Sequence, residues 1–314
     1  MVDPDTFLTA LYVVIDDFGK AHLPPEPPCP GPAAALSRAE LLTLAIFGQW
    51  HGFGSERGSY RYARRHLRAA FPALPTREQF NRQLRHYGGA LAACVLYLGE
   101  LLQARRGAPY EALDTAAVPT RAAKRRGGGW LPGLADIGWS NRLGWFEGVR
   151  LLLAVTPAGV ITGFALAPGS AKEQPLAETF FALRRHPHPR AAGVGAPALG
   201  PYLTDKGFEG RDRHRRWAEE YGAVVICPPP RWRSRGGVPP WPRAWRRWLA
   251  GKRQIGETAV AELTHTFRLD RERPHSLAGL QARVAAKMAL HNFCLWLNDQ
   301  LSRPPLAFAD LVDW

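Results

Sequence analysis

Between residues 1 and 108, apolar residues recur every three or four positions, which is the spacing of one helix face. Phe7–Phe18 carries the first such stripe. Ser37–Glu40 and Thr76–Gln79 each begin a later helix with the Ser/Thr-x-x-Glu/Gln pattern of a capping box, which satisfies free backbone N–H groups. Gly88 and the glycine after it predict a break in the last helix. We therefore expect an all-helical N-terminal region over residues 1–108.

After Pro109 the apolar pattern changes from the helical period to that of β-strands. Tyr110–Asp114 predicts a short strand, and Trp145–Val155 with Val160–Ala167 predicts a hairpin joined by a tight Pro-Ala-Gly turn. Ala171–Arg185 then predicts a helix. Near the C-terminus, Leu277–Leu301 has apolar residues at helical spacing and predicts a helix that packs on the core.

The stretch Leu199–Cys227 predicts a strand, a turn, a charged helix and a second strand. Added to the preceding strand, hairpin and helix, this is the element order of an RNase H-like core. We therefore predict an α/β fold, with an RNase H-like mixed sheet flanked by helices and preceded by an all-helical region. The core is expected over residues 109–301, with a C-terminal tail at 302–314.

Three acidic residues occupy suggestive places in these elements. Asp114 lies in the first predicted strand, Asp205 follows a strand where the chain turns, and Glu257 lies in a predicted helix. Strand ends carry the chemistry of open α/β sheets, although an Asp that merely starts a turn needs no chemical role. Two strand-borne Asp residues followed by a helix-borne Glu match the acids of a two-metal phosphoryl-transfer site.

A cluster of such acids needs counter-charges. Two carboxylates about 4 Å apart repel by roughly 4 kcal/mol at an effective dielectric of 20. The cluster is tolerated if some acids stay protonated or if cations lie among them. Hard oxygen ligands favour Mg²⁺, with Mn²⁺ as a substitute, and two ions would hold a phosphate from both sides.

Four short segments carry a family resemblance. They are Leu-Asp-Thr-Ala-Ala-Val-Pro at 113–119, Phe-Glu-Gly-Val-Arg at 146–150, Leu-Thr-Asp-Lys-Gly-Phe at 203–208, and Arg-x-x-x-Glu-Thr at 253–258. In this order they resemble the DDE transposases of bacterial insertion sequences, in the insertion-sequence-four-like superfamily. The resemblance implies hydrolysis of DNA at the ends of the element, followed by strand transfer into target DNA. It also implies a homodimer on paired ends.

The same resemblance assigns roles to individual residues. It implies that Asp114, Asp205 and Glu257 are the catalytic, metal-binding acids. Arg253, one helical turn before Glu257, would hold a phosphate, and Lys206 and Arg150 occupy positively charged flanking positions.

The chain also departs from the family pattern at three places. Ala250 and Thr264 stand where many relatives have Tyr and Lys, and Ser170–Glu173 replaces the usual Asn-x-x-Asp. These departures predict a different set of phosphate contacts.

Composition indicates the partner. The chain is globular in composition, with 46% hydrophobic residues, yet it carries a formal net charge of +14, and most of its basic residues are Arg. A polyanion, and nucleic acid above all, accounts for this surplus more simply than a generally basic surface does. No long apolar run or basic leader is present in the sequence, so we expect no membrane contact and a cytoplasmic, nucleoid-associated bacterial protein.

The segment Pro228–Gly251 combines Trp and Arg side chains immediately before Glu257. Arg246, Arg247, Trp245 and Trp248 are the candidates for contact with DNA, because guanidinium groups suit phosphates and flat rings suit unpaired bases. The alternative is a Trp-rich cover packed on the core. In the helical N-terminal region, Arg interleaved with aromatic residues also suits DNA, and a helix-turn-helix there stays open.

Two other functions stay open at this stage. One is a basic DNA-binding protein that descends from a transposase and has no catalytic activity. The other is a nuclease of RNase H fold that acts on a different substrate. An intact set of three acids argues against the first, because DNA binding does not require acids in a positive field.

Overall fold

The computed structural model describes residues 1–25, 34–50, 53, 55–104, 106–121, 131–229 and 241–313. Five helices open the chain: α1 Pro4–His22, α2 Arg38–Phe47, α3 Glu56–His66, α4 Arg77–His86 and α5 Gly88–Leu101. Both predicted capping boxes are present, at Ser37 with Glu40 and at Thr76 with Gln79. The predicted break separates α4 from α5 at Tyr87, whose N–H still bonds to Gln83.

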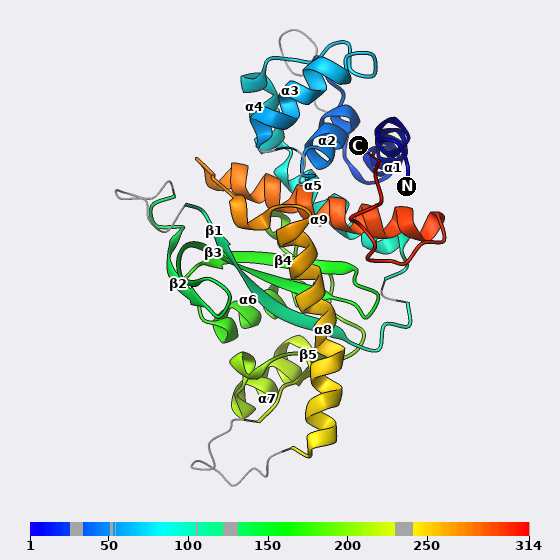
Figure 1. The fold of residues 1–314 in the computed structure, drawn as a ribbon. Helices are drawn as coiled ribbons and strands as arrows, with labels where there is room; N and C mark the ends of the chain where they lie inside the picture. Colours follow the sequence, from blue (N-terminus) through cyan, green and yellow to red (C-terminus); the bar gives the residue numbers. More distant parts are fainter. Residues whose placement is uncertain are drawn as a thin grey trace.

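A six-stranded mixed sheet follows the helical region (Figure 1). Its strands are β1 Glu111–Pro119, β2 Asp136–Ser140, β3 Gly144–Val155, β4 Ile161–Pro168, β5 Tyr202–Leu203 and β6 Val225–Ile226. The order is β2-β3-β1-β5-β6, with β4 also paired to β3. The strand β1 is antiparallel to β3 and parallel to β5. The strand predicted to end at Asp114 therefore continues to Pro119, and β2 was not predicted.

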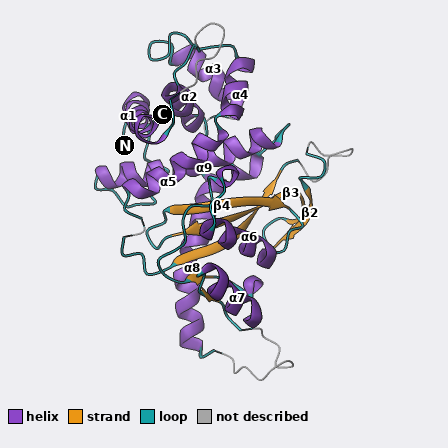
Figure 2. Cartoon of the chain, turned by 180° about the vertical axis from the view of Figure 1, so that it is seen from behind, coloured by secondary structure: helices purple, strands orange, loops and turns teal. Residues whose placement is uncertain are grey.

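Helices cover both faces of the sheet. They are α6 Glu173–Arg185, α7 Arg211–Tyr221, α8 Arg243–His265 and α9 Leu277–Gln300, with short 3-10 turns η1 Pro189–Ala191, η2 Lys206–Phe208 and η3 Leu269–Arg271. Helix α8 crosses one face, and α6 lies on the opposite face, as the views from front and behind show (Figures 1 and 2). This arrangement confirms the predicted α/β, RNase H-like fold class.

Helix α8 corrects the interpretation of Pro228–Gly251. From Arg243 onward this segment forms the first turns of the helix that carries Glu257, and is not a connection leading to it. Residues 230–240 of the segment lie outside the described residues. The helix begins directly after Pro242, a position where a missing N–H costs nothing.

Helix α9 links the helical region to the sheet, and the prediction of a core-packing helix is confirmed. It lies between the N-terminal helices and the sheet (Figure 1), and its residues belong to one apolar core shared by both. The core is therefore continuous across the expected boundary at residue 108. In the expected tail, Phe308, Leu311 and Val312 are buried in this same core.

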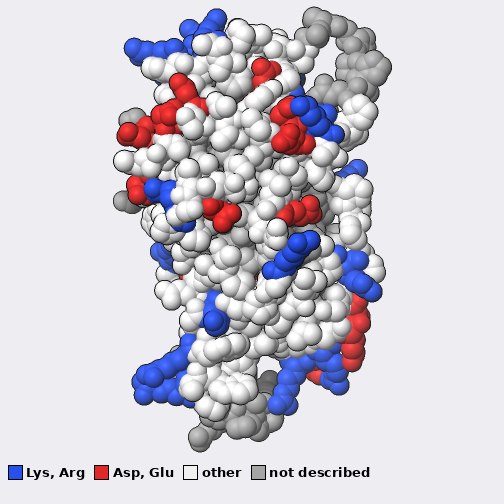
Figure 3. Space-filling view, turned by 90° about the vertical axis from the view of Figure 1, so that its right-hand side faces the viewer, with Lys and Arg blue, Asp and Glu red and all other residues white. Residues whose placement is uncertain are grey.

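Charge is unevenly spread on the surface. In Figure 3, Lys and Arg side chains gather toward the lower end of the displayed face, while acidic side chains are more frequent in its upper half. The first turns of α8 lie at this lower end (Figure 1) and carry Arg243, Arg246 and Arg247. Within the described residues, no helix is long and apolar enough to cross a membrane.

Candidate active site

The candidate site forms where β5 ends and β1 continues. Strand β5 pairs with β1 at Glu111 and Ala112, after which the chain turns away into η2. The part of β1 from Asp114 to Ala117 therefore lines an open cleft with a volume of about 1290 Å³. Five acids line the cleft: Asp114, Glu173, Asp205, Glu209 and Glu257. All three sequence-predicted acids are thus brought to one place.

Asp114 and Glu257 come together because α8 crosses β1. The crossing point is Gly256, a buried residue whose Cβ, if it had one, would lie 3.5 Å from the Cβ of Asp114. Glu257 is the next residue along the helix and is exposed to the cleft. On the strand, one carboxylate oxygen of Asp114, Oδ1, accepts a hydrogen bond from the backbone N–H of Thr115 at 2.8 Å.

Asp205 is held by the turn that follows β5. It is the N-cap of η2, and its Oδ1 accepts a hydrogen bond from the N–H of Gly207 at 2.8 Å. The thiol of Cys227, the residue after β6, donates to the backbone carbonyl of Asp205 at 3.0 Å. Burial raises the pKa of this thiol to about 12, so the thiol keeps its proton and remains a donor.

The electrostatics of the cleft follow from this grouping. The pKa of Asp114 is raised from 3.8 to about 6, mainly by burial and in smaller part by the charges of Asp205 and Glu257, while the Thr115 N–H and Arg253 act to lower it. The acids therefore lie within electrostatic reach of one another. Arg253 lies one helical turn before Glu257, and among the described residues its buried Nε has no hydrogen-bond partner.

Glu173 is a fourth acid that the sequence reasoning did not assign to the site. Its Oε1 accepts a hydrogen bond from the Thr115 hydroxyl at 2.7 Å and lies 3.8 Å from Arg150 Nη1. Its Oε2 lies so close to Gly207 that a Cβ there would be 1.6 Å away. Burial raises the pKa of Glu173, and the charge of Asp205 raises it as well.

A sequence signal for Glu173 did exist. The residue ends the Ser170–Glu173 segment, which stands in place of Asn-x-x-Asp in the resembling family, so this position keeps its acid while the others change. Glu173 is also the first residue of α6, immediately after the hairpin. Helix α6 holds the Glu173 carboxylate at one face of β1, where it contacts Thr115, whereas α8 packs against the other face at Asp114.

The donor set suits a hard divalent cation. In both Asp114 and Asp205 one carboxylate oxygen is occupied by a neighbouring N–H, which leaves Oδ2 of each for a ligand. Across the described parts of the chain, however, no three His, Cys, Asp or Glu side chains are grouped closely enough to hold one ion. A complete ligand set therefore requires side chains to move closer or phosphate oxygens to contribute.

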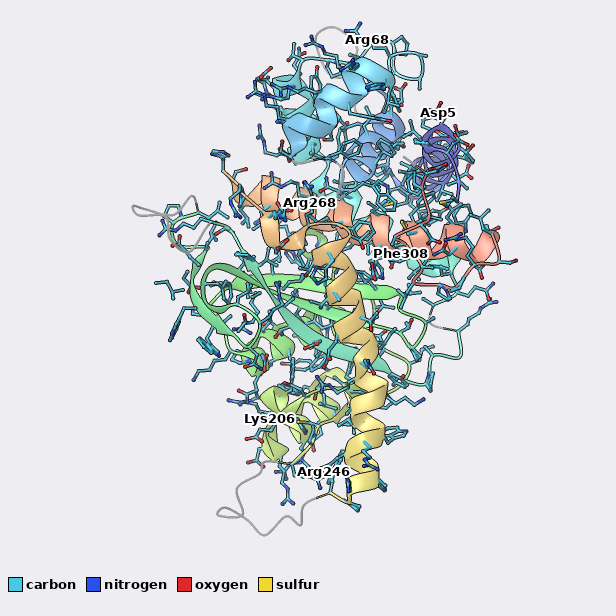
Figure 4. All side chains as sticks on the ribbon, viewed as in Figure 1. Asp5, Arg68, Lys206, Arg246, Arg268 and Phe308 are labelled. Atoms are coloured by element: carbon cyan, nitrogen blue, oxygen red, sulfur yellow. The ribbon has the colours of Figure 1, made fainter. Side chains whose placement is uncertain are left out.

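The basic residues predicted for the site have different surroundings. Lys206 is exposed at the cleft (Figure 4). Arg150 also lines the cleft, but it donates to the backbone carbonyls of Trp139 at 3.0 Å and Gly169 at 3.3 Å, so it also ties the hairpin to the site. Glu262, on the same helix as Glu257, accepts from Thr266 and is not among the cleft-lining residues.

The four candidates from the Arg- and Trp-rich segment lie farther along α8. Arg246 and Arg247 are exposed, and Trp245 and Trp248 are 61% and 48% exposed. Figure 4 shows Arg246 near the lower end of α8, beyond Lys206. Exposed rings favour a surface role over a packing role, and contact with DNA at these positions stays a prediction.

Comparison with known proteins agrees with this geometry. No curated protein and no solved structure matches the chain. The family described as "Transposase DDE domain" matches residues 112–293, a range that includes all five acids of the cleft. The match is compatible with the insertion-sequence-four-like superfamily without identifying it. Because the matched range covers more than half of the 314 residues, the chain belongs to the DDE transposase domain family.

Proposed function

We propose that this transposase binds the ends of its insertion sequence, hydrolyses phosphodiester bonds there, and joins the 3′ ends to target DNA. The observation that carries the proposal is the meeting of Asp114, Asp205 and Glu257 in one cleft of a DDE transposase domain. Transposases of this family typically depend on divalent metals. When bound, Mg²⁺ or Mn²⁺ would activate the attacking water or 3′-hydroxyl and stabilise the departing oxygen.

The residues of the chain supply the ligands and the orientation. Asp114 and Asp205 are fixed by hydrogen bonds to neighbouring backbone N–H groups, so their free oxygens are held on rigid parts of the core. Glu257 is exposed on α8 and has more freedom to adjust when metal and DNA enter. A preorganised pair with one adjustable ligand suits a site that is completed by its substrate.

Positive groups would hold the DNA against these acids. Arg253 is not among the cleft-lining residues, so its buried, unpartnered Nε would have to turn toward the cleft to bind a phosphate oxygen. Exposed Lys206 adds charge at the cleft itself. Arg150 contributes charge as well, with part of its hydrogen bonding already used by the hairpin. Along α8, Arg246 and Arg247 would contact the backbone of the DNA end, with Trp245 and Trp248 beside them.

The remaining parts of the proposal concern assembly. The helical region over residues 1–108 would contact the terminal inverted repeats, and two copies of the chain would hold the paired ends as a homodimer. A strongly basic protein of this kind would stay with the nucleoid.

The test is an end-cleavage assay with DNA that carries the terminal repeats bracketing the gene. Wild-type protein and Asp205→Asn are incubated with labelled duplex and Mg²⁺, and a circular plasmid is added as target. The proposal predicts nicking at the repeat boundary and transfer of the label to the plasmid by the wild type alone. Binding without cleavage would instead support a catalytically silent DNA-binding protein. Cleavage that ignores the repeats would support a nuclease with another substrate.

A further inference from the structure

The hairpin of β2 and β3 exposes an apolar surface beside the acids. Trp139 and Trp145 lie directly opposite each other across the two strands, and they are 52% and 68% exposed. Ile137, two residues before Trp139 on the same face, is 64% exposed. We call these three residues the aromatic platform. All three line the cleft that contains the five acids.

The two indole rings are held in a fixed arrangement. Their centroids are 5.5 Å apart and their planes meet at 70°, the edge-to-face contact that aromatic pairs prefer. Arg150 Nη2 donates to the backbone carbonyl of Trp139, and Arg150 Nη1 donates to the hydroxyl of Thr115, next to Asp114. The platform is therefore connected to the acid site through one side chain.

Its exposure is not explained by packing. Fully burying a large apolar side chain gains about 1.5–3 kcal/mol, so two exposed Trp rings and an Ile on one surface forgo a substantial stabilisation. Exposed apolar surface of this kind marks a site that another molecule covers. The platform is one wall of a cleft, which limits the molecules that fit it.

The rest of the cleft indicates what that molecule is. Its volume of about 1290 Å³ exceeds the roughly 300–1,000 Å³ typical of small-molecule pockets, so it suits a segment of a polymer. Cationic side chains stand around it, including Arg142, Lys172 and Lys206. A partner with negative charges and flat apolar faces is a nucleic acid strand whose bases are unpaired.

We propose that Trp139 and Trp145 stack against an unpaired base next to the scissile phosphate. The bases of an intact duplex stack on each other and expose no face, so the platform would act at an opened DNA end or a displaced nucleotide. The inference rests on the proposed function, because it assumes that DNA enters the acid cleft. It adds a binding surface on the β2–β3 hairpin, separate from the Trp residues of α8.

The experiment compares DNA ends that differ only in one strand's terminal bases. Fluorescence anisotropy measures the affinity of Asp205→Asn protein for a fully paired end, for an end with three unpaired nucleotides, and for the same end with abasic sites. Trp139→Ala, Trp145→Ala and Trp145→Phe are introduced into this background. Leu199→Ala is the matched control, because Leu199 is 77% exposed and lies outside the cleft lining.

The platform predicts a specific pattern. Each Trp→Ala change should weaken binding to the unpaired end by about 5- to 150-fold, which corresponds to one lost base–aromatic stack. Binding to the abasic end should change little, Trp145→Phe should keep most of the affinity, and Leu199→Ala should match the parent. Melting temperatures should stay close to that of the parent, because the rings are exposed.

Other outcomes would overturn the inference in distinguishable ways. If the parent and the Trp variants bind the unpaired end equally well, the aromatic platform does not contact a base, and the proposed function is unaffected. A parent protein that binds none of the DNA ends removes both. Unchanged DNA affinity together with a shift from dimer to monomer in sedimentation velocity would make the platform a contact between two copies of the chain.

Discussion

At the scale of single residues, the buried charge of Asp114 lowers the stability of the folded protein. Its folded pKa of about 6 lies above its ordinary value of 3.8, so the folded state binds the proton more tightly than the unfolded state. Stability contributed by this group is therefore lost as pH rises from about 4 to 6, and the full cost is present at neutral pH. The shift corresponds to at most about 3 kcal/mol.

The first prediction follows from this cost. Asp114→Asn should abolish cleavage in Mg²⁺ but raise the free energy of unfolding at pH 7.5, by up to about 3 kcal/mol, since the neutral amide keeps the Thr115 hydrogen bond without a buried charge. Urea unfolding of both proteins at pH 4.5, 6 and 7.5 measures it. The advantage of the variant should shrink as pH falls. An advantage that does not change with pH would contradict the assigned pKa.

The second prediction concerns the contact between Glu173 and Gly207. Gly207→Ala should displace the Glu173 carboxylate, because the new Cβ would lie 1.6 Å from Oε2, and the resulting strain should cost about 1–3 kcal/mol. The rate of DNA cleavage should also fall, because the displaced Glu173 carboxylate lies beside Asp205.

A double-mutant cycle supplies the control for this contact. Combining Gly207→Ala with Glu173→Ala removes the clashing carboxylate. The double variant should therefore lose less stability than the sum of the losses in the two single variants. Chemical denaturation of all four proteins gives the coupling. Strict additivity would mean that the two residues do not touch in solution.

At the scale of elements, Asn292 joins three parts of the fold. From buried α9 it donates to the carbonyls of Val95 on α5 and Ile161 on β4, at 3.0 and 2.9 Å. Its side-chain carbonyl accepts from the N–H of Ile161 at 3.0 Å. The backbone N–H and carbonyl of Ile161, the first residue of β4, are thus both hydrogen-bonded to a side chain of α9.

The third prediction tests that junction. Asn292→Ala should remove the side-chain partner of the N–H and the carbonyl of Ile161, at about 1–3 kcal/mol each, so the loss of stability should be at least about 2 kcal/mol. Gln300→Ala, exposed at the end of the same helix, is the control and should change stability by less than about 0.5 kcal/mol. Thermal and urea unfolding measure both. A similar small effect for the two variants would show that water replaces the Asn292 contacts.

Elements with local signals were predictable, and those fixed by distant contacts were not. The capping boxes before α2 and α4 are local hydrogen bonds, so the sequence alone located both helix starts. The strand β2 is only five residues long and forms by pairing with β3, and no local sequence pattern predicts that pairing. The early start of α8 was missed because a run of Trp and Arg suggested a surface segment.

The candidate site divides in the same way. The order and setting of Asp114, Asp205 and Glu257 were sufficient to predict that they meet, although Asp114 lies within β1 and not at its end. Glu173 could not be placed from spacing, because its position depends on how α6 packs against Gly207. Likewise, nothing in the local sequence shows that Trp139 and Trp145 lie opposite each other and beside the acids.

At the scale of the whole molecule, charge determines how DNA is held. The net charge of +14 is large, while the cleft itself is lined by five acids, so phosphate contacts must come mainly from surfaces around it. If about six to ten phosphates are contacted, affinity should fall about 10³–10⁵-fold between 50 and 200 mM salt. Anisotropy titrations with end DNA measure the slope. A nearly flat dependence would remove the link between the Arg surplus and DNA.

The last prediction assigns part of that slope to the lower end of α8. Arg246→Ala and Arg247→Ala should each reduce the salt slope by about one contact and weaken binding to all sequences alike, as loss of a phosphate contact does. Stability should barely change, because both side chains are exposed. Arg185→Ala is the matched control, since Arg185 is exposed in the last turn of α6 and lies away from the cleft lining. If the control lowers the slope as much as the α8 variants do, the charge acts as a diffuse field and the first turns of α8 hold no particular phosphate.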